Sequence, residues 1–496
     1  MALIDLFLIA LYLLGMAGMG FYFMRRNRDA DAYFRADGRL PWWVVSLSIY
    51  ATMFSSITFI SIPAMSYSGD MSYVVLQFGI LLMAPVVVRW YLPFFRKLNL
   101  TSAYEYLEVR FNLPCRLFAS AAFILFMVVR AAIVTYLPAL AIATVTGVDI
   151  NLAIASVVVV TVLYCTVGGI EAVVWSDFVQ SLILIGSTAL ILVWAVCGTD
   201  GGLSGFIAKG LDAGKFRVFD FAFDWSRPCF WVLLVGGIVA NLASYTSDQC
   251  VVQRYMTTRD ERGAARSILF NGVLSFINSF IFFAMGVALW TFYRSHAGAL
   301  PDGTKPDAVL PLFIAHELPP GLSGIVLAAV AAATMSTLSA NLNSAASAIT
   351  TDFYRRLVVV GSRTVEGKIH CTTTTSDYDS RLLLCGKIST VIVGLAGGLV
   401  ALWLANADVG NIYNQFQRFL GVLTGGLGCL FFMGVFMKRV NGFGAICGLA
   451  ANYIVCIALD RLSFAGKPHL LLYGTMGMAV CLAVAPICSR FRRERK

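Results

Sequence analysis

The sequence has few charged residues. Asp, Glu, Lys and Arg together make up 13% of the 496 residues, whereas soluble domains carry about 25%. Hydrophobic residues make up 59%, and the mean hydropathy is +0.78. A soluble enzyme of this composition could not cover its surface with polar groups, and disorder requires low hydrophobicity. The apolar runs are continuous and do not alternate, which argues against a β-barrel. The composition therefore predicts an all-α polytopic membrane protein.

The sequence also lacks the motifs of ATP-driven and metal-dependent proteins. It contains no P-loop, only four histidines, and no C-x-x-C pair among its twelve cysteines. Residues 1–23 carry Asp5 but no Lys or Arg, so the basic region of a cleaved signal peptide is missing and this segment is predicted to remain as a first span. We therefore expect neither ATP-driven transport nor enzymatic chemistry.

Thirteen apolar segments have the length of about 20 residues that a helix needs to cross a bilayer. We place them at 3–23, 42–67, 71–94, 115–146, 151–169, 177–198, 229–248, 267–293, 320–351, 381–405, 413–437, 442–461 and 468–488. The connections between them are short, so we expect a single membrane domain over residues 1–496. The longest insert on the basic side, 355–380, is expected to be a solvated loop.

The net charge of +10 comes from basic residues on alternate connections between these segments. One side carries the clusters at 25–28, 96–97, 254–266, 355–356 and 438–439 and the tail 490–496. The positive-inside rule makes this side cytoplasmic, so the charges indicate topology and not nucleic-acid binding. The pattern predicts an inner-membrane protein with its N-terminus outside and its C-terminus in the cytoplasm, which requires an odd number of spans.

Two of the predicted spans carry polar or flexible residues in their middle. The second span contains Thr52, Ser55, Ser56 and Thr58, and the seventh contains Gly236, Gly237, Asn241 and Ser244. The two spans are five apart, which fits two inverted repeats of five spans at 42–198 and 229–437, with an extra span at 3–23 and two more at 442–488. Transporters place their substrate and ions beside such interrupted helices. Alternatively, these small residues only allow close helix packing.

Two ionisable residues lie where the sequence predicts the membrane. Arg130 is midway along the fourth span, with no acidic residue nearby on that span. Because a guanidinium binds a carboxylate with two parallel hydrogen bonds, Arg130 fits a substrate carboxylate; the alternative is a structural pair with a distant Asp or Glu. Asp177 opens the sixth span and is either a helix cap or part of a cation site.

The ninth span places hydroxyl groups among small residues, at Ser336, Thr337 and Ser339. Hard cations take oxygen ligands, and hydroxyls together with carbonyls of an unwound helix can supply them without a charge. In the repeat scheme this span corresponds to the fourth, which places it next to the core. Packing of small residues is the alternative explanation.

The chain resembles the sodium/solute symporter family over nearly its whole length. The segment VGGIEAVVWSDFVQ, residues 167–180, is similar to the family signature, and DQCVVQRYMTTRD, residues 248–260, resembles the segment that follows the seventh span. ATMFSSITFISIPA, VVRAAIVTYL with Arg130, and FFRKLNLTSAYEYLEVRF are most similar to bacterial sialic acid symporters. The resemblance implies a LeuT-type inverted-repeat fold and alternating access driven by inward sodium movement.

The resemblance also implies site residues. The substrate, a sialic acid (N-acetylneuraminate), would contact Ser55, Ser56, Thr58, Tyr73, Gln77, Arg130 and Asn241, with Arg130 on its carboxylate. One sodium site would use Ala51, Phe54, Ala333, Ser336 and Thr337. A second would use Asp177 and Ser339, but Met53 and Ala340 stand where such symporters carry Thr and Ser. A thioether is a poor ligand for sodium, so we expect the second site to bind it weakly or not at all.

The sequence thus predicts a sodium-coupled sialic acid symporter that works as a monomer in the lipid bilayer. The alternatives are a symporter for another small carboxylate or sugar acid, and a channel. A channel would need a selectivity filter or a charged ring, and two interrupted spans in one chain favour a carrier. A membrane enzyme is a third alternative, against which the few histidines and intramembrane acids argue.

Overall fold

The computed structural model describes residues 2–98, 100–359, 375–407, 425–462 and 466–491. In these ranges the chain is helical, and its one extended pairing is an isolated bridge between Leu40 and Thr258. The α-helices are α1 (Leu3–Phe23), α2 (Ala30–Arg35), α3 (Trp42–Met53), α4 (Ser56–Ser68), α5 (Phe78–Val86), α6 (Leu92–Leu98), α7 (Glu105–Arg110), α8 (Leu113–Thr146), α9 (Ile150–Gly198), α10 (Gly202–Asp212), α11 (Phe230–Thr246), α12 (Gln249–Met256), α13 (Glu261–Ser295), α14 (Pro306–His316), α15 (Leu322–Ala348), α16 (Thr375–Asn406), α18 (Gly442–Arg461) and α19 (Tyr473–Phe491), with a shorter helix at Gly425–Phe436. The segments η3 (Ser72–Gln77), η4 (Val87–Tyr91) and η5 (Ile349–Val359) continue neighbouring helices.

Within the described ranges, nine helices are long and apolar enough to cross a membrane, or up to eleven if each bent pair counts as one span. The predicted spans 151–169 and 177–198 lie together in α9, which bends at Gly169, where φ is +60°. The predicted span 413–437 lies partly outside the described residues, as does most of the predicted loop 355–380. The prediction of an all-α membrane-type architecture is confirmed.

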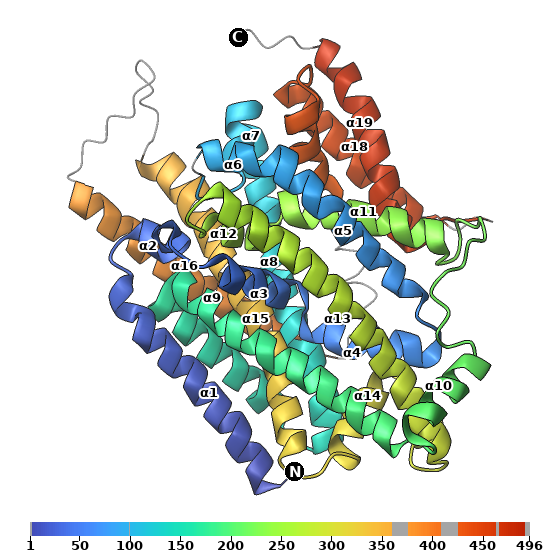
Figure 1. Cartoon of the computed structure of the whole chain (residues 1–496). Helices are drawn as coiled ribbons and strands as arrows, with labels where there is room; N and C mark the ends of the chain where they lie inside the picture. Colours follow the sequence, from blue (N-terminus) through green and yellow to red (C-terminus); the bar gives the residue numbers. More distant parts are fainter. Residues whose placement is uncertain (1, 99, 360–374, 408–424, 463–465, 492–496) are drawn as a thin grey trace.

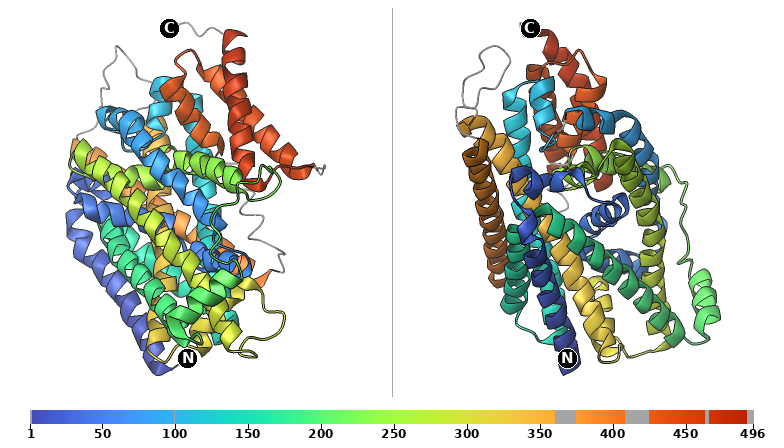
Figure 2. Two further views of the ribbon diagram at one scale, coloured as in Figure 1. Left: turned by 45° about the vertical axis from the view of Figure 1, so that its right-hand side comes forward. Right: turned by 60° about the vertical axis from the view of Figure 1, so that its left-hand side comes forward.

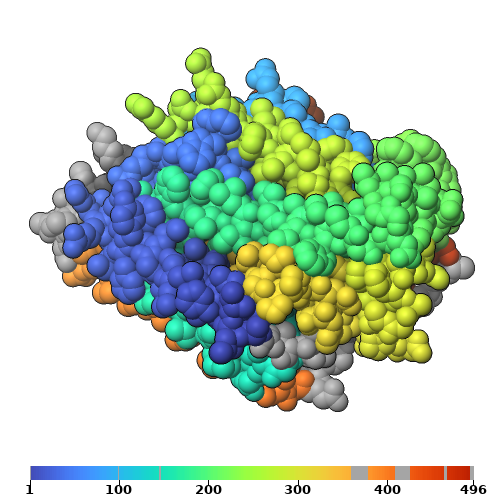
Figure 3. Space-filling model, turned by 60° about the horizontal axis from the view of Figure 1, so that its bottom comes forward, coloured from blue at the N-terminus to red at the C-terminus, as the bar shows by residue number. Residues whose placement is uncertain are grey.

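Helix α15 occupies the centre of the bundle. Of its apolar span, Leu322–Val358, 83% is buried, compared with 22% for the span that contains α1. Figure 1 shows α15 running between α8, α9 and α13, and the two views of Figure 2 place α18 and α19 side by side at the edge. The start of α1 and the end of α19 lie at opposite ends of the molecule (Figure 1). In the view from below, α10 projects at one side of the face that carries the N-terminus (Figure 3).

Polar contacts hold α15 and its continuation η5 at both ends. At the first end, the Asp5 carboxylate of α1 accepts hydrogen bonds from the backbone of Gly321 and Gly324, at 2.8 and 3.0 Å. At the other end, the buried Asp352 pairs with Arg116 of α8 at 2.8 Å. Because α15 is fixed at both ends, its middle is a rigid wall for any site beside it.

Both predicted interruptions exist as breaks between helices. Helices α3 and α4 meet at 65° across Phe54 and Ser55, and the Ser55 hydroxyl accepts a hydrogen bond from the first turn of α4. Helices α11 and α12 meet at 55°, and the Asp248 carboxylate caps α12. The second break therefore falls at the end of the predicted span 229–248 and not at its glycines. A Cβ on Gly237 would lie 2.4 Å from the Leu76 carbonyl oxygen, so this glycine allows close packing.

Candidate functional site

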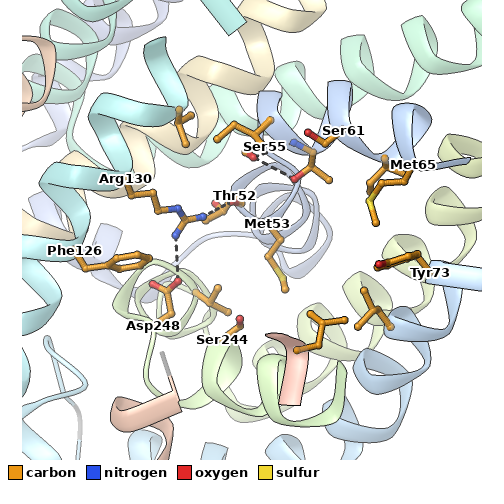
Figure 4. A pocket seen from close by; sticks show the side chains of 17 residues that line it. Thr52, Met53, Ser55, Ser61, Met65, Tyr73, Phe126, Arg130, Ser244 and Asp248 are labelled. Atoms are coloured by element: carbon orange, nitrogen blue, oxygen red, sulfur yellow. Dashed lines mark hydrogen bonds and ion pairs between the residues drawn. The ribbon is translucent and has the colours of Figure 1, made fainter. Parts of the chain in front are cut away.

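A cavity of about 370 Å³ lies at the two helix breaks. The first break contributes Thr52, Met53 and Ser55, and α4 continues the wall. Helix α8 adds Phe126 and Arg130 from one side, while Ser244 and Asp248 come from the second break (Figure 4). Four of the seven predicted substrate residues line this cavity: Ser55, Thr58, Tyr73 and Arg130.

The Arg130 guanidinium reaches across the cavity to both breaks (Figure 4). Its Nη1 lies 3.4 Å from Oδ2 of Asp248, and its Nη2 donates to the carbonyl oxygen of Thr52 at 3.3 Å. Asp248 is thus the distant acidic partner that the sequence left open. Each contact is long and uses a single nitrogen, so the pair lacks the two parallel hydrogen bonds of a strong arginine–carboxylate pair. The guanidinium can therefore receive a further anion from the cavity.

The other three predicted substrate residues lie outside the cavity wall. The buried Ser56 hydroxyl donates to the Val134 carbonyl oxygen at 3.2 Å and so ties α4 to α8. The Asn241 amide donates to the Gly237 carbonyl oxygen of its own helix at 2.8 Å. Gln77 ends η3, and the lining of this wall comes instead from Tyr73 and Leu76. On a helix, neighbouring positions face different directions, which explains why Ser55 lines the cavity and Ser56 does not.

Several lining residues were not predicted from the sequence. Ser61 and Met65 follow Thr58 at helical spacing, so they share one face of α4 and could have been found from Thr58. Ser244 and Asp248 line the cavity because the second break lies at Ser247 and Asp248. An acidic residue at the end of an apolar span was the available signal for Asp248.

Four of the five predicted sodium ligands meet between α3 and α15. The Ser336 hydroxyl lies 3.0 Å from the Ala51 carbonyl oxygen and 3.1 Å from that of Ala333. The Thr337 hydroxyl lies 3.2 Å from the same Ala333 oxygen. Oxygen ligands about 2.4 Å from one hard cation, at roughly right angles, lie about 3.4 Å apart. The cluster thus has the spacing and the oxygen chemistry of a small-cation site.

The fifth predicted ligand, Phe54, is the residue after the last turn of α3. Its backbone, at φ −93° and ψ 86°, has left the helical conformation. A carbonyl at such a break no longer has the partner that a helix interior would give it. Phe54 therefore belongs to the same helix end as Ala51.

Asp177 lies in a different environment from the one that the sequence suggested. It is inside α9, so the interpretation as a helix cap is wrong. Its carboxylate pairs at 2.8 Å with Arg254 of α12, and neither side chain is exposed. The Ser48 hydroxyl of α3 donates to the same carboxylate at 2.5 Å, and that of Ser339 lies at 3.5 Å.

Arg254 was assigned from the sequence to a basic connection outside the membrane, and this assignment is wrong. The residue lies in the second half of a broken helix and is fully buried. Its other donors are used as well, by the Ser48 hydroxyl and the Cys250 carbonyl oxygen, both at 2.8 Å. The guanidinium already neutralises Asp177, so this carboxylate does not need a cation from solution.

The described residues contain no group of three or more His, Cys, Asp or Glu side chains that could hold a metal ion. The oxygen cluster of α3 and α15 is built from hydroxyls and carbonyls, so it is a site of another kind. Such a site suits a monovalent cation, because it brings no negative charge to offset a divalent one.

Comparisons with known proteins agree with this geometry. A family model described as the sodium:solute symporter family matches residues 33–451. The sodium/sialic acid symporter SiaT of Proteus mirabilis is 36% identical over 474 residues, covering 95% of this chain and 92% of that protein. The sodium/sialic acid symporter NanT of Aliivibrio fischeri is 34% identical over 474 residues, covering 95% and 90%.

Solved structures show the same fold. A substrate-bound, outward-open Na⁺-coupled sialic acid symporter superposes with a TM-score of 0.89 at 34% identity, covering 100% of this chain and 99% of that one. The nucleobase-cation-symport-1 transporter Mhp1 superposes with a TM-score of 0.56 at 16% identity, covering 92% of this chain and 94% of that one. The second likeness concerns the fold alone.

Proposed function

The chain belongs to the sodium:solute symporter family, and we propose that it couples inward sodium movement to the uptake of a sialic acid by alternating access. It is a transporter and not an enzyme. Two relatives that are about 35% identical over 95% of the chain are sodium/sialic acid symporters, and so is the structure that superposes over 100% of the chain. Sodium is therefore a co-transported ion in this proposal.

One observation carries the proposal: two consecutive carbonyl groups at the end of α3 belong to the two sites. The Ala51 oxygen faces the Ser336 hydroxyl in the cation cluster. The oxygen of Thr52 accepts a hydrogen bond from Arg130 in the cavity. A sodium ion on the Ala51 oxygen would hold this helix end in place and so position the next carbonyl for Arg130. Binding of the two ligands would then be coupled, as a symporter requires.

We propose Ser55, Thr58, Tyr73 and Arg130 as substrate contacts, with Arg130 on the carboxylate. Ser56, Gln77 and Asn241 would support the wall without lining it. Ala51, Phe54, Ala333, Ser336 and Thr337 are proposed as the sodium ligands. Asp177 and Ser339 would not form a second sodium site, because Arg254 supplies the positive charge there.

The finer topology is proposed from the sequence pattern and the broken helices. We propose thirteen spans in one domain of residues 1–496, with repeats at 42–198 and 229–437, an extra span at 3–23 and two at 442–488. The two bent pairs fall in the second and seventh predicted spans, at corresponding positions of these repeats. The basic clusters support an N-terminus outside and a C-terminus in the cytoplasm of a bacterial inner membrane. The protein would act as a monomer in the lipid bilayer.

Purified protein in liposomes tests the proposed function. With a sodium gradient directed inward, labelled N-acetylneuraminate should accumulate above its external concentration, and a potassium gradient of the same size should not support this. Simple equilibration would indicate a channel. Accumulation of another sugar acid, but not of N-acetylneuraminate, would keep the symport mechanism and overturn the substrate.

A further inference from the structure

A second cavity, of about 420 Å³, lies away from the site described above. It is formed where the end of α4, the segment after α10 and the end of α13 meet. This is the side of the molecule on which α10 projects (Figure 3). Lys215 and Arg294 line it together with the rings of Tyr67, Trp290 and Tyr293. No acidic side chain belongs to its described lining.

Two cations of this cavity share one aromatic ring. The Lys215 Nζ lies 5.0 Å from the centre of the Trp290 ring, and the Arg294 Cζ lies 5.2 Å from it. The Lys215 ammonium is also held by the carbonyl oxygens of Tyr67 and Gly69, at 2.7 and 2.8 Å. It is therefore a fixed charge, with its side chain only 7% exposed.

The positive charge of this cavity is not balanced by a neighbouring acid. Asp70 lies close to Lys215, but its carboxylate is bound by Arg217 at 2.7 Å and by the Ser72 hydroxyl. Arg294 is exposed and makes no ion pair or hydrogen bond within the described part of the chain. Burial, and also the charge of Arg294, lower the pKa of Lys215, an effect that Asp70 offsets in part. A bound anion would relieve the repulsion between the two cations.

We propose that this cavity binds the carboxylate of an acidic sugar and is a second, outer binding site for the transported substrate. The identity of the sugar rests on the proposed function. A cavity of 420 Å³ is in the range of sites for whole small molecules, and an inorganic anion would fill little of it. Three aromatic rings beside two cations suit a ligand with an apolar ring face and a negative charge, because aromatic faces take apolar surface while their polar tips stay wet.

The outer site is connected to the central cavity by α4. Ser61 and Met65 line the central cavity, and Ser68, on the same face of the helix, lines the outer one. From Ser61 to Ser68 the helix rises by about 10 Å. A sugar held at the outer site would therefore be close to the central one. Since the outer cavity lacks the hydroxyl and carbonyl cluster of α3 and α15, binding there should not require sodium.

Tryptophan fluorescence of the purified full chain tests this proposal, since Trp290 is part of the site. N-acetylneuraminate is titrated in choline buffer without sodium. We expect a saturable change in the wild type and in Arg130→Ala, which affects only the central cavity. Arg294→Gln should weaken binding about tenfold or more, the effect of losing one charge-assisted hydrogen bond. Trp290→Phe should remove the optical signal.

Arg262→Gln is the matched control, because Arg262 is an exposed arginine at the other end of the same helix, α13. It should bind like the wild type, and all variants should keep the thermal midpoint of the wild type. A signal that persists in Trp290→Phe, or an affinity unchanged in Arg294→Gln, would overturn the outer site.

Two further arms separate the alternatives. If inorganic phosphate displaces N-acetylneuraminate at equal or lower concentration, the cavity is a site for phosphate or a lipid headgroup, and the acidic sugar is wrong. The neutral sugar N-acetylmannosamine should not compete. Uptake into liposomes is measured in parallel: sodium-driven uptake without sodium-free binding would overturn the outer site alone, whereas a wild type without sodium-driven uptake would overturn the proposed function.

Discussion

Asp177 and Arg254 form an ion pair of 2.8 Å in which neither side chain is exposed. The pair joins α9 to α12, and the Ser48 hydroxyl extends it to α3. A symporter of this family could neutralise such a carboxylate with a sodium ion, but here a guanidinium occupies that role. Two neighbouring features point the same way: Met53 offers only a thioether, and the Ala340 side chain offers no oxygen.

We therefore predict one sodium per substrate. One sodium with one sialic acid anion is electroneutral, whereas two sodium ions would carry one net charge inward. A membrane potential acts on each net charge by about 2.3 kcal/mol per 100 mV. Uptake into liposomes should consequently change little when valinomycin and a potassium gradient impose an inside-negative potential. Strong stimulation, with a sodium Hill coefficient clearly above one, would mean that a second sodium binds after all.

The buried pair should also matter for stability. Removing one partner leaves an uncompensated charge, so Asp177→Asn or Arg254→Gln alone should cost about 3–5 kcal/mol of stability. The double variant should cost clearly less than the sum, as thermal unfolding in detergent can measure. The exposed pair of Asp31 and Arg35 on α2 is the control, and Asp31→Asn should cost at most about 1 kcal/mol. Additive effects of Asp177→Asn and Arg254→Gln would contradict a coupled pair.

Arg130 should be essential for substrate binding. Losing one partner of a desolvated, hydrogen-bonded charge pair costs about 2–5 kcal/mol, which is roughly 30-fold to several-thousand-fold in affinity. We expect Arg130→Ala to abolish uptake and Arg130→Lys to leave it severely impaired, because a point charge cannot reproduce the guanidinium fork. Isothermal titration with N-acetylneuraminate measures this. A folded Arg130→Ala protein with unchanged affinity would remove Arg130 from the substrate site.

Asp248 provides a test of how Arg130 is held before the substrate arrives. Its carboxylate competes with a substrate carboxylate for the guanidinium, and it also caps α12. Asparagine caps a helix as well as aspartate does, so Asp248→Asn removes the competing charge and keeps the cap. We expect tighter binding of N-acetylneuraminate, by several-fold. Weaker binding, with the fold intact, would mean that Asp248 itself contacts the substrate.

Some of these features could be predicted from the sequence and others could not. Arg130, and the hydroxyls of Ser336 and Thr337, were found because a charge or a polar cluster inside an apolar span is costly and so conspicuous. Arg254 was missed because basic residues near a span end are read as topology markers, and only the bend between α11 and α12 places this one in the core.

Neighbouring positions were the least predictable. Ser55 and Ser56 look equivalent in the sequence, but the geometry of the break turns one toward the cavity and the other toward Val134. The pairing of Arg130 with Asp248 joins residues far apart in the chain. Such contacts depend on how helices pack, which local patterns do not encode.

The cation cluster can be tested with two threonines of α15. Thr337→Ala removes one proposed sodium ligand and should raise the sodium concentration needed for half-maximal binding of N-acetylneuraminate. Thr334→Ala is the control, because the Thr334 hydroxyl only donates to the Val330 carbonyl oxygen of its own helix, at 2.9 Å. By linkage, the loss of substrate affinity in Thr337→Ala should be large at low sodium and should mostly disappear at high sodium.

The central claim is that the carbonyl groups of Ala51 and Thr52 couple the sodium site to the substrate site. The most direct test is the dissociation constant of N-acetylneuraminate for the wild type, measured by isothermal titration over a series of sodium concentrations. The account predicts that affinity rises with sodium, with a slope of about one on a logarithmic plot, and that Thr337→Ala shifts this dependence to higher sodium while Thr334→Ala does not. A dissociation constant independent of sodium, or a dependence that Thr337→Ala leaves unchanged, would contradict it.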